Sequence, residues 1–305
     1  MIRAGVAALP RRQYNRSIPS FEDVTEMNPT PRIALFHDLS GYGRCSLTVA
    51  LPVLSAMGGQ CCPVPTAYLS AHTAYPASDK AVFLDMTGQM AGVAPHWQEL
   101  GASFGAIYSG FLGSERQIGV LQDFIRAFRR AETLVLIDPV MGDYGAPYRT
   151  YTPAMCRRMG ELAAMADVIT PNLTEVSLLL GEPYEERPGE DTLRRWLDRL
   201  SLEGRRSVAV TGVHLTDGRV GAACLDRATG RVSCAMAVEE PAHFPGTGDL
   251  YASVLLGSLL RGEDLAAANG RAVEFVQRCA RRTLELGTPP LEGVQFEPLL
   301  GELTK

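Results

Sequence analysis

The sequence lacks the features that direct a protein to nucleic acid, a membrane or an oxidising compartment. Its 29 basic residues are scattered and the formal net charge is -5, so no extended cationic surface is expected. No apolar stretch reaches the roughly 18 to 20 residues that span a bilayer. Seven cysteines without a C-x-x-C pair argue against a disulfide framework and a zinc site. We therefore expect a cytoplasmic protein with small-molecule partners, no nucleic acid and no membrane.

The beginning of the chain differs from the remainder. Residues 1–30 mix charged, polar and proline residues without sustained hydrophobic periodicity, and this pattern predicts a flexible N-terminal extension. No composition break divides the chain after that, so residues 31–305 are expected to form a single domain. Met27 precedes the first strand-like run closely, and we hypothesise that it, rather than Met1, is the true start.

Alternating strand-like and helical runs predict an α/β fold. Short apolar runs each precede a longer helical run, which is typical of β-α-β units around a mostly parallel sheet covered by helices. The three clearest pairs are 33–36 with 47–57, 106–108 with 115–130, and 134–137 with 153–166. Later strands are expected at 168–169 and 207–211, and later helices at 174–180, 191–202 and 264–286. The chain is long enough, and at 46% hydrophobic apolar enough, to bury a large core.

Turn-forming residues between two short β-like runs interrupt the alternation of strands and helices. Residues 221–225 and 231–235 flank the segment Asp226-Arg227-Ala228-Thr229-Gly230, which predicts an antiparallel hairpin at the sheet edge. The fold class expected is therefore a doubly wound α/β domain with a mostly parallel central sheet and an antiparallel edge hairpin.

Polar residues gather immediately after the predicted strands. In an open α/β sheet the ligand lies beyond the strand carboxyl ends, so these residues are the first candidates for a site. They belong to the segments His37–Gly43, Thr66–Thr73, Ser109–Phe111, Asp138–Asp143, Thr170–Glu175 and Thr211–Gly212.

The segment Gly246-Thr247-Gly248-Asp249 joins a flexible turn to a strongly apolar helical pattern. Two glycines allow backbone N–H groups to face a ligand, and a helix N-terminus adds a favourable dipole, so the turn is suited to phosphate. Asp249 in the first turn could accept a proton from a hydroxyl that becomes a phosphate ester. A lone Gly-x-Gly-Asp is more often an ordinary glycine turn with a capping Asp, and the other strand-end residues favour the catalytic interpretation here.

Taken in order, these motifs resemble the ribokinase-like superfamily, and more narrowly its pyridoxal and pyridoxamine (vitamin B6) kinases. The likeness covers about residues 32–290. It rests on Gly246–Asp249, on Asp138-Pro139-Val140-Met141-Gly142-Asp143, on Thr170-Pro171-Asn172-x-x-Glu175, and on Ser70-x-His72-Thr73. The resemblance implies a three-layer α/β/α fold and a kinase that uses ATP with Mg²⁺.

For the chemical step, the resemblance implies that Asp249 is the base that activates the substrate's 5'-hydroxymethyl group. Gly246, Thr247 and Gly248 would supply backbone amides as an anion hole for the transferred phosphoryl group. Such donors stabilise the charge that develops on the equatorial oxygens in phosphoryl transfer.

For the metal and nucleotide, the resemblance assigns Asn172 and Glu175 to Mg²⁺, a hard ion that prefers oxygen ligands. It places four nucleotide-side residues near the phosphates: Asp138, Asp143, Thr211 and Gly212. The competing interpretation of Asn172 and Glu175 is a capped helix N-terminus. Residues 268–276 would form part of the adenine wall.

For the vitamer ring, the resemblance points to Ser40, Thr66 and His72, with Phe111 covering the pyridine. An aromatic face with hydroxyl and imidazole groups suits a heterocycle that has a ring nitrogen and a 3-hydroxyl. Simple packing is an equally good explanation of Thr66 and Phe111, and a structural hydrogen bond is an equally good explanation of His72. Cys45 could be a reactive thiol near an aldehyde, although a buried inert cysteine is the more common case.

The function expected is phosphorylation of pyridoxamine, pyridoxal or pyridoxine in vitamin B6 salvage. Two departures leave the substrate open, because Tyr42–Ser46 is shorter and more basic than in many pyridoxal kinases and Ala74 replaces a common glycine. The alternatives are a hydroxymethylpyrimidine or hydroxymethylpyrimidine phosphate kinase of thiamine synthesis, a sugar or nucleoside kinase, and a non-catalytic B6-binding protein. Relatives further imply a homodimer and a K⁺ requirement.

Overall fold

The computed structural model of the chain describes residues 30–215 and 217–305. The predicted N-terminal extension lies outside these residues except for Thr30, as do both candidate start methionines. Residues Pro31–Lys305 cluster into one unit. Within the described residues, no helix combines the length and apolar character that crossing a membrane requires.

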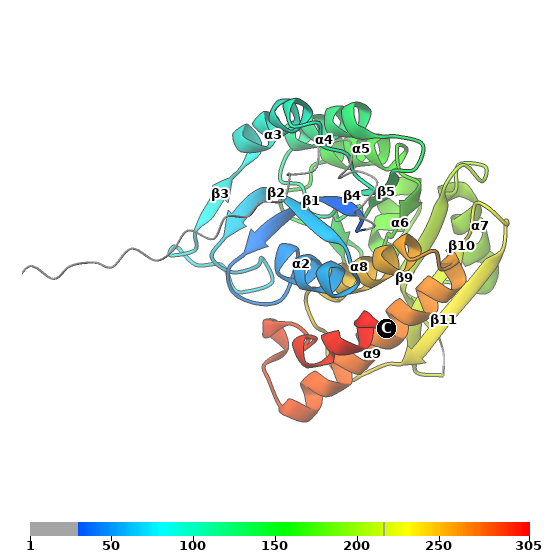
Figure 1. Cartoon of the computed structure of the whole chain (residues 1–305). Coiled ribbons are helices and arrows are strands. Elements are labelled where there is room, and N and C mark those ends of the chain that lie inside the picture. The colour runs from blue at the N-terminus through cyan, green and yellow to red at the C-terminus, as the bar shows by residue number, and fades with distance from the viewer. Residues whose placement is uncertain (1–29, 216) are drawn as a thin grey trace, which may run out of the picture. The chain divides into compact units, whose positions relative to one another are not determined.

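One mixed sheet of nine strands runs through this part of the chain, in the order β11-β10-β9-β8-β5-β4-β1-β2-β3 (Figure 1). The pairs that join β2, β1, β4, β5, β8 and β9 are parallel, and β3, β10 and β11 add antiparallel edges. The strands are β1 (Arg32–Ser40), β2 (Gln60–Leu69), β3 (Phe83–Asp85), β4 (Ala106–Ser109), β5 (Leu134–Ile137), β8 (Val168–Ile169), β9 (Ser207–His214), β10 (Arg219–Leu225) and β11 (Val232–Val238).

Helices cover both faces of the sheet (Figure 1). They are α2 (Leu47–Ala56), α3 (Thr87–Glu99), α4 (Glu115–Phe128), α5 (Pro153–Ala163), α6 (Leu173–Leu180), α7 (Glu190–Leu200), α8 (Thr247–Leu260) and α9 (Leu265–Leu286). A two-stranded ribbon, β6 (Gly142–Asp143) with β7 (Ala146–Pro147), follows β5. The three-layer α/β/α fold and the antiparallel edge hairpin predicted from the sequence are confirmed, with the hairpin strands extending to Arg219 and Val238.

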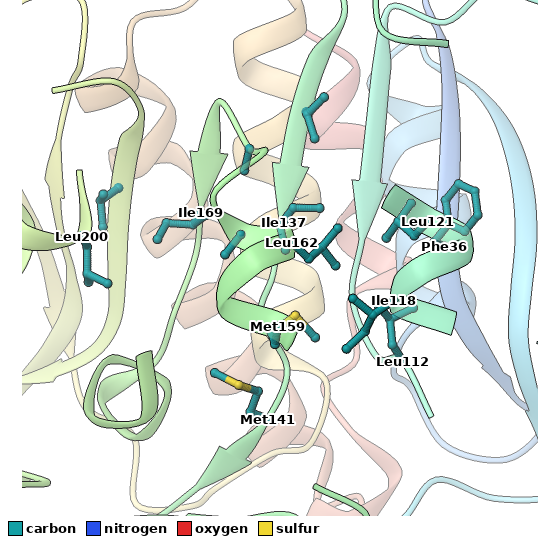
Figure 2. Packing of buried hydrophobic residues seen from close by; sticks show 14 of the residues in the cluster. Phe36, Leu112, Ile118, Leu121, Ile137, Met141, Met159, Leu162, Ile169 and Leu200 are labelled. Atoms are coloured by element: carbon teal, nitrogen blue, oxygen red, sulfur yellow. The ribbon is translucent and has the colours of Figure 1, made fainter. Parts of the chain in front are cut away.

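Two hydrophobic cores form because side chains alternate between the faces of each strand. On β1, Ala34 and Phe36 point to the core beneath α3 to α7, which Figure 2 shows around Phe36, Ile137 and Met159. Ile33 and Leu35 point to the opposite core, beneath α2, α8 and α9. The central strands are therefore apolar on both sides, which is the pattern of a parallel sheet covered by helices.

Helix α8 is buried on all sides, because every residue from Leu250 to Ser258 is buried. A helix with such a sequence needs apolar neighbours around its whole circumference. Packing between the sheet, α2 and α9 fixes the helix axis and therefore fixes the position of its first turn. That turn contains Asp249.

Candidate active site

Asp249 lies in the first turn of α8, and its carboxylate faces the β1–α2 loop. Oδ2 accepts a hydrogen bond of 2.8 Å from the Ser46 backbone N–H, and 14% of the side chain remains exposed. Burial, reinforced by the charge of Asp38, raises the pKa of Asp249 to about 7, although the Ser46 N–H opposes the shift. The carboxyl group is therefore accessible and close to the pKa that suits a base at neutral pH.

Gly246 provides the turn that precedes this helix. Its φ of 78° lies in the left-handed region, and a Cβ there would overlap the Arg44 carbonyl oxygen. The β1–α2 loop therefore packs directly against the glycine turn. The first N–H groups of α8, including those of Thr247 and Gly248, have no partner within the helix, which makes this end suitable for an anion.

Asp38 anchors the same loop from the end of β1. Its Oδ2 accepts a hydrogen bond of 2.8 Å from the Ser40 hydroxyl, and Oδ1 accepts one of 2.5 Å from the Ser46 hydroxyl. The side chain is buried, and burial raises the pKa of Asp38. Ser40, which the sequence suggested as a vitamer ligand, thus uses its hydroxyl on a neighbouring carboxylate.

A second group of carboxylates lies beyond β5 and β8. Asp138 follows β5 and accepts a 3.0 Å hydrogen bond from the Thr170 hydroxyl. Burial, with the charge of Asp249, raises the pKa of Asp138 to about 8. Glu175 accepts hydrogen bonds from the backbone N–H groups of Asn172, at 2.8 Å, and Met141, at 3.1 Å. Burial, with the charge of Asp138, raises the pKa of Glu175 well above its ordinary value.

Asn172 and Glu175 form a reciprocal capping box at the start of α6. The Asn172 Oδ1 accepts the Glu175 N–H at 2.9 Å, and the Glu175 carboxylate accepts the Asn172 N–H. The Asn172 amide also donates to the Gly142 carbonyl at 2.9 Å, which ties the β6–β7 ribbon to this helix. The helix-capping interpretation is therefore confirmed, and the metal role of both residues stays a prediction.

The predicted nucleotide-side residues lie around this helix end. Thr211 pairs with Asn172 through an isolated parallel bridge, and its N–H donates to the Pro171 carbonyl at 2.9 Å. Gly212, next along β9, has a φ of 68°, a conformation that favours glycine. Asp143 is in the β6–β7 ribbon, where burial raises its pKa. The structure thus brings Asn172, Thr211 and the ribbon together at the carboxyl edge of the sheet.

The four predicted vitamer residues come from three neighbouring strand ends and the loop after β2. The Thr66 hydroxyl bonds the Phe111 carbonyl at 2.9 Å, so these two residues meet directly. His72 Nε2 lies 2.8 Å from the Leu291 carbonyl, and the ring packs against Tyr75 with centroids 4.6 Å apart. The structural hydrogen bond considered for His72 is therefore present. Roles in vitamer binding stay predictions.

Three neighbours of Asp249 received no role from the sequence, namely His37, Asp38 and Ser46. His37 and Asp38 are polar residues at the end of a buried strand, and that signal placed both in a candidate segment without indicating a role. Ser46 carried no signal, because its contact joins residues 203 positions apart. Cys45 is buried among these groups, and burial with the charges of Asp249 and Asp38 raises the pKa of its thiol. A buried thiol with a raised pKa stays protonated and is therefore unreactive as a nucleophile.

The carboxylates at this edge fit a divalent cation. Described residues include no Lys or Arg that forms an ion pair with Asp138 or Glu175. Nor do they include a cluster of three His, Cys, Asp or Glu side chains that would hold a metal alone. Mg²⁺ in nucleotide enzymes needs only one or two carboxylates, because phosphates and waters complete its octahedron. The donor set therefore suits Mg²⁺ that arrives with a nucleotide.

A glycine turn at a helix N-terminus and a buried carboxyl group with a raised pKa, both at the carboxyl edge of a doubly wound sheet, are typical of small-molecule kinases of the ribokinase-like class. The chain belongs to the phosphomethylpyrimidine kinase family, because the model of that family matches residues 99–292. It is therefore a phosphotransferase, and the superfamily inferred from its motifs is confirmed.

Individual relatives match most of the chain. A pyridoxine/pyridoxal/pyridoxamine kinase of Bordetella avium is 33% identical over 244 residues, which cover 78% of this chain and 79% of the relative. A Bacteroides thetaiotaomicron protein, provisionally described as a phosphomethylpyrimidine kinase and crystallised with pyridoxal, is 42% identical with a TM-score of 0.86. That match covers 90% of this chain and 96% of the other. Pyridoxal kinase from Lactobacillus plantarum is 31% identical with a TM-score of 0.82, over 90% and 96% of the two chains.

Proposed function

We propose that this protein transfers the γ-phosphoryl group of ATP to the 5'-hydroxymethyl group of a vitamin B6 vitamer in B6 salvage. The observation that carries the proposal is the position of Asp249 beside the Gly246 turn, because its raised pKa and partial exposure support a role as the base. The named activity of the Bordetella avium relative and the pyridoxal complex of the Bacteroides thetaiotaomicron protein support the choice of acceptor.

The reaction needs one proton acceptor and several fixed hydrogen-bond donors. Asp249 takes the proton of the vitamer hydroxyl as the alcohol oxygen bonds to the γ-phosphorus, and the bond from that phosphorus to the bridging oxygen of ADP breaks. Backbone N–H groups of Gly246, Thr247 and Gly248 stabilise the equatorial oxygens of the transferred group. Donors that are fixed in advance by the fold need no reorganisation during transfer.

Asn172 and Glu175, through the capped end of α6, would hold Mg²⁺ and its waters close to the nucleotide phosphates. The ion supplies neutralisation of phosphate charge when it is bound. Asp138, Asp143, Thr211 and Gly212 surround the same helix end and would border the phosphates. The uncompensated carboxylates, whose pKa values burial raises, support this placement because a cation would relieve their mutual repulsion.

The vitamer would occupy the space bordered by Ser40, Thr66, His72 and Phe111. His72 retains one buried ring nitrogen, Nδ1, without a hydrogen-bond partner among the described residues. Such a nitrogen can bond a ligand hydroxyl or ring nitrogen. This supports a heterocyclic acceptor with polar groups on its ring.

A hydroxymethylpyrimidine or hydroxymethylpyrimidine phosphate acceptor is the second candidate, because the matching family is described by that activity. A non-catalytic B6-binding protein is less well supported, since Asp249, the glycine turn and Glu175 are all intact. The test measures ADP release with pyridoxamine, pyridoxal, pyridoxine and hydroxymethylpyrimidine offered separately. Higher kcat/KM with the pyrimidine would contradict the B6 assignment, and tight vitamer binding without ADP release would indicate a binding protein.

We also propose that the protein is a cytoplasmic homodimer and that K⁺ assists the nucleotide site, as the family resemblance implies. The edge strand β3 supports an association between copies. Phe83 is 56% exposed and Leu84 is 54% exposed, and an apolar edge of this kind is usually covered. Light scattering of the purified protein, beside Phe83→Glu, tests the dimer, and turnover in Na⁺ against K⁺ buffers tests the cation.

A further inference from the structure

Ser46 departs from an ordinary helix N-cap in two respects. Its φ of 51° and ψ of -129° lie in a region that glycine favours and that residues with a Cβ occupy only at a cost in free energy. Its hydroxyl makes no hydrogen bond to α2, although serine at an N-cap ordinarily accepts one from the first turn. Both features reduce local stability, so contacts elsewhere must hold Ser46 in this conformation.

Those contacts are with two aspartates. The Ser46 N–H donates to Asp249 Oδ2 at 2.8 Å, and the Ser46 hydroxyl donates to Asp38 Oδ1 at 2.5 Å. Asp38 is itself oriented by the Ser40 hydroxyl and is 5% exposed. A continuous hydrogen-bonded chain therefore runs from the end of β1 through Ser46 to the carboxylate at the start of α8.

We propose that Ser46 is a positioning residue for Asp249, an inference that rests on Asp249 being the base of the proposed reaction. The strained turn aims its N–H at Oδ2, which leaves Oδ1 to accept the substrate proton. Asp38 holds the turn in this conformation through the Ser46 hydroxyl. This role explains both unusual features of Ser46. A relaxed backbone conformation would redirect the N–H from Asp249, and a capping hydrogen bond to α2 would redirect the hydroxyl from Asp38.

Other titratable groups also face Asp249, and of these Asp38 raises its pKa. They come from each element around it, and they are His37 and Asp38 on β1, Tyr108 on β4, Asp138 after β5, Tyr148 after β7 and Cys45 before α2. Substitution of Ser46 leaves the other groups in place but removes the hydroxyl that hydrogen-bonds Asp38. A change in the pH profile of a Ser46 variant therefore reports the hydrogen-bonded chain from Asp38 through Ser46 to Asp249.

The test compares Ser46→Ala with Ser46→Gly. Both remove the hydroxyl and keep the N–H, but only glycine fits the observed φ and ψ without strain. We expect Ser46→Gly to melt a few degrees above Ser46→Ala, and both to lose about 10- to 100-fold in kcat, the effect of a small misplacement of a reacting group. The KM for ATP should stay unchanged. The acidic limb of the kcat profile should move to higher pH, because a carboxylate with a poorly held donor has a higher pKa.

Glu203 offers a matched control, because it also has a positive φ, 63°, and lies in the turn after α7. Glu203→Gly should melt above Glu203→Ala without a change in kcat. Wild-type kcat and an unshifted acidic limb in either Ser46 variant, with Asp249→Asn inactive, would overturn the positioning role alone. Near-normal turnover of Asp249→Asn would instead overturn the assignment of the base, and the role of Ser46 with it.

Discussion

The Nδ1 atom of His37 lies 3.8 Å from Oδ1 of Asp249, and the imidazole is completely buried. Burial lowers the pKa of His37 to about 3, so the ring is neutral at physiological pH. Tyr108 packs edge-on against it, with ring centroids 4.3 Å apart. His37 therefore supplies no positive charge that would lower the pKa of Asp249, and that pKa remains raised.

The pH dependence of turnover should follow from this relationship. Asp249 must be ionised to accept a proton, and its pKa is raised to about 7, so kcat/KM for the vitamer should fall as pH decreases through about 7. Below that value the loss should approach tenfold per pH unit. Initial rates between pH 5 and 9, at saturating Mg²⁺ and ATP, provide the measurement. A flat profile from pH 5 to 8 would be incompatible with Asp249 as the base.

Asp249→Asn should reduce kcat by roughly two to four decades, which is the usual contribution of a general base. Asparagine keeps an oxygen that can accept the Ser46 N–H, so the loop and the affinity for ATP should change little. Steady-state kinetics together with titration of ATP test both statements. Turnover within a few-fold of the wild-type value would remove Asp249 from the proposed role.

Asp138 should make the ligand-free protein less stable at alkaline pH. The pKa of Asp138 is raised from 3.8, its ordinary value, to about 8 in the folded state. Between these two pH values the folded protein therefore binds one more proton than the unfolded chain. The unfolding free energy should consequently fall as pH rises from about 4 to about 8. Asp138→Asn should flatten this decline and raise the melting temperature at pH 8, measured without nucleotide or Mg²⁺. An identical pH dependence in the variant would show that the carboxyl group of Asp138 is not destabilised by burial.

Gly246→Ala tests the close packing of the glycine turn. The new methyl group would overlap the Arg44 carbonyl oxygen, so we expect a loss of melting temperature and of kcat together. Gly204→Ala is the matched control, because Gly204 has a φ of 79° and the described part of the chain places no atom within 4 Å of the added Cβ. Both substitutions carry the cost of a positive φ, about 1–3 kcal/mol. Equal losses in the two variants would mean that the contact with Arg44 adds nothing.

Hydrophobic patterning predicted most of the sheet. β1, β4 and β5 contain short apolar runs buried on both faces, and each is followed by a longer helical run, so their order along the chain defined the β-α-β units. The edge hairpin was predicted from its turn residues. β3 and α3 were missed, because β3 has only three residues, all exposed, and α3 lacks a clear apolar stripe.

β2 shows why local rules failed in this region. Pro63 and Pro65 argue against a strand, because proline cannot donate a ladder hydrogen bond. β3 pairs only with Ala67, Tyr68 and Leu69, so among the described strands β2 has a partner on one side alone where the prolines occur. The missing N–H groups can therefore face the open side. The position of a strand within the sheet is a tertiary property that a local pattern does not contain.

The sequence by itself determined the class of fold and the chemical character of the site. Strand periodicity, the Gly246–Asp249 turn and the polar strand ends are local patterns, and their physical consequences follow from neighbouring residues. Only the tertiary structure decided which atoms these residues contact. The Ser46 N–H reaches Asp249 across 203 positions, and the hydroxyl of Ser40 donates its hydrogen to Asp38. Such contacts depend on how α8 packs against the sheet, because burial and proximity set both the hydrogen bonds and the pKa values.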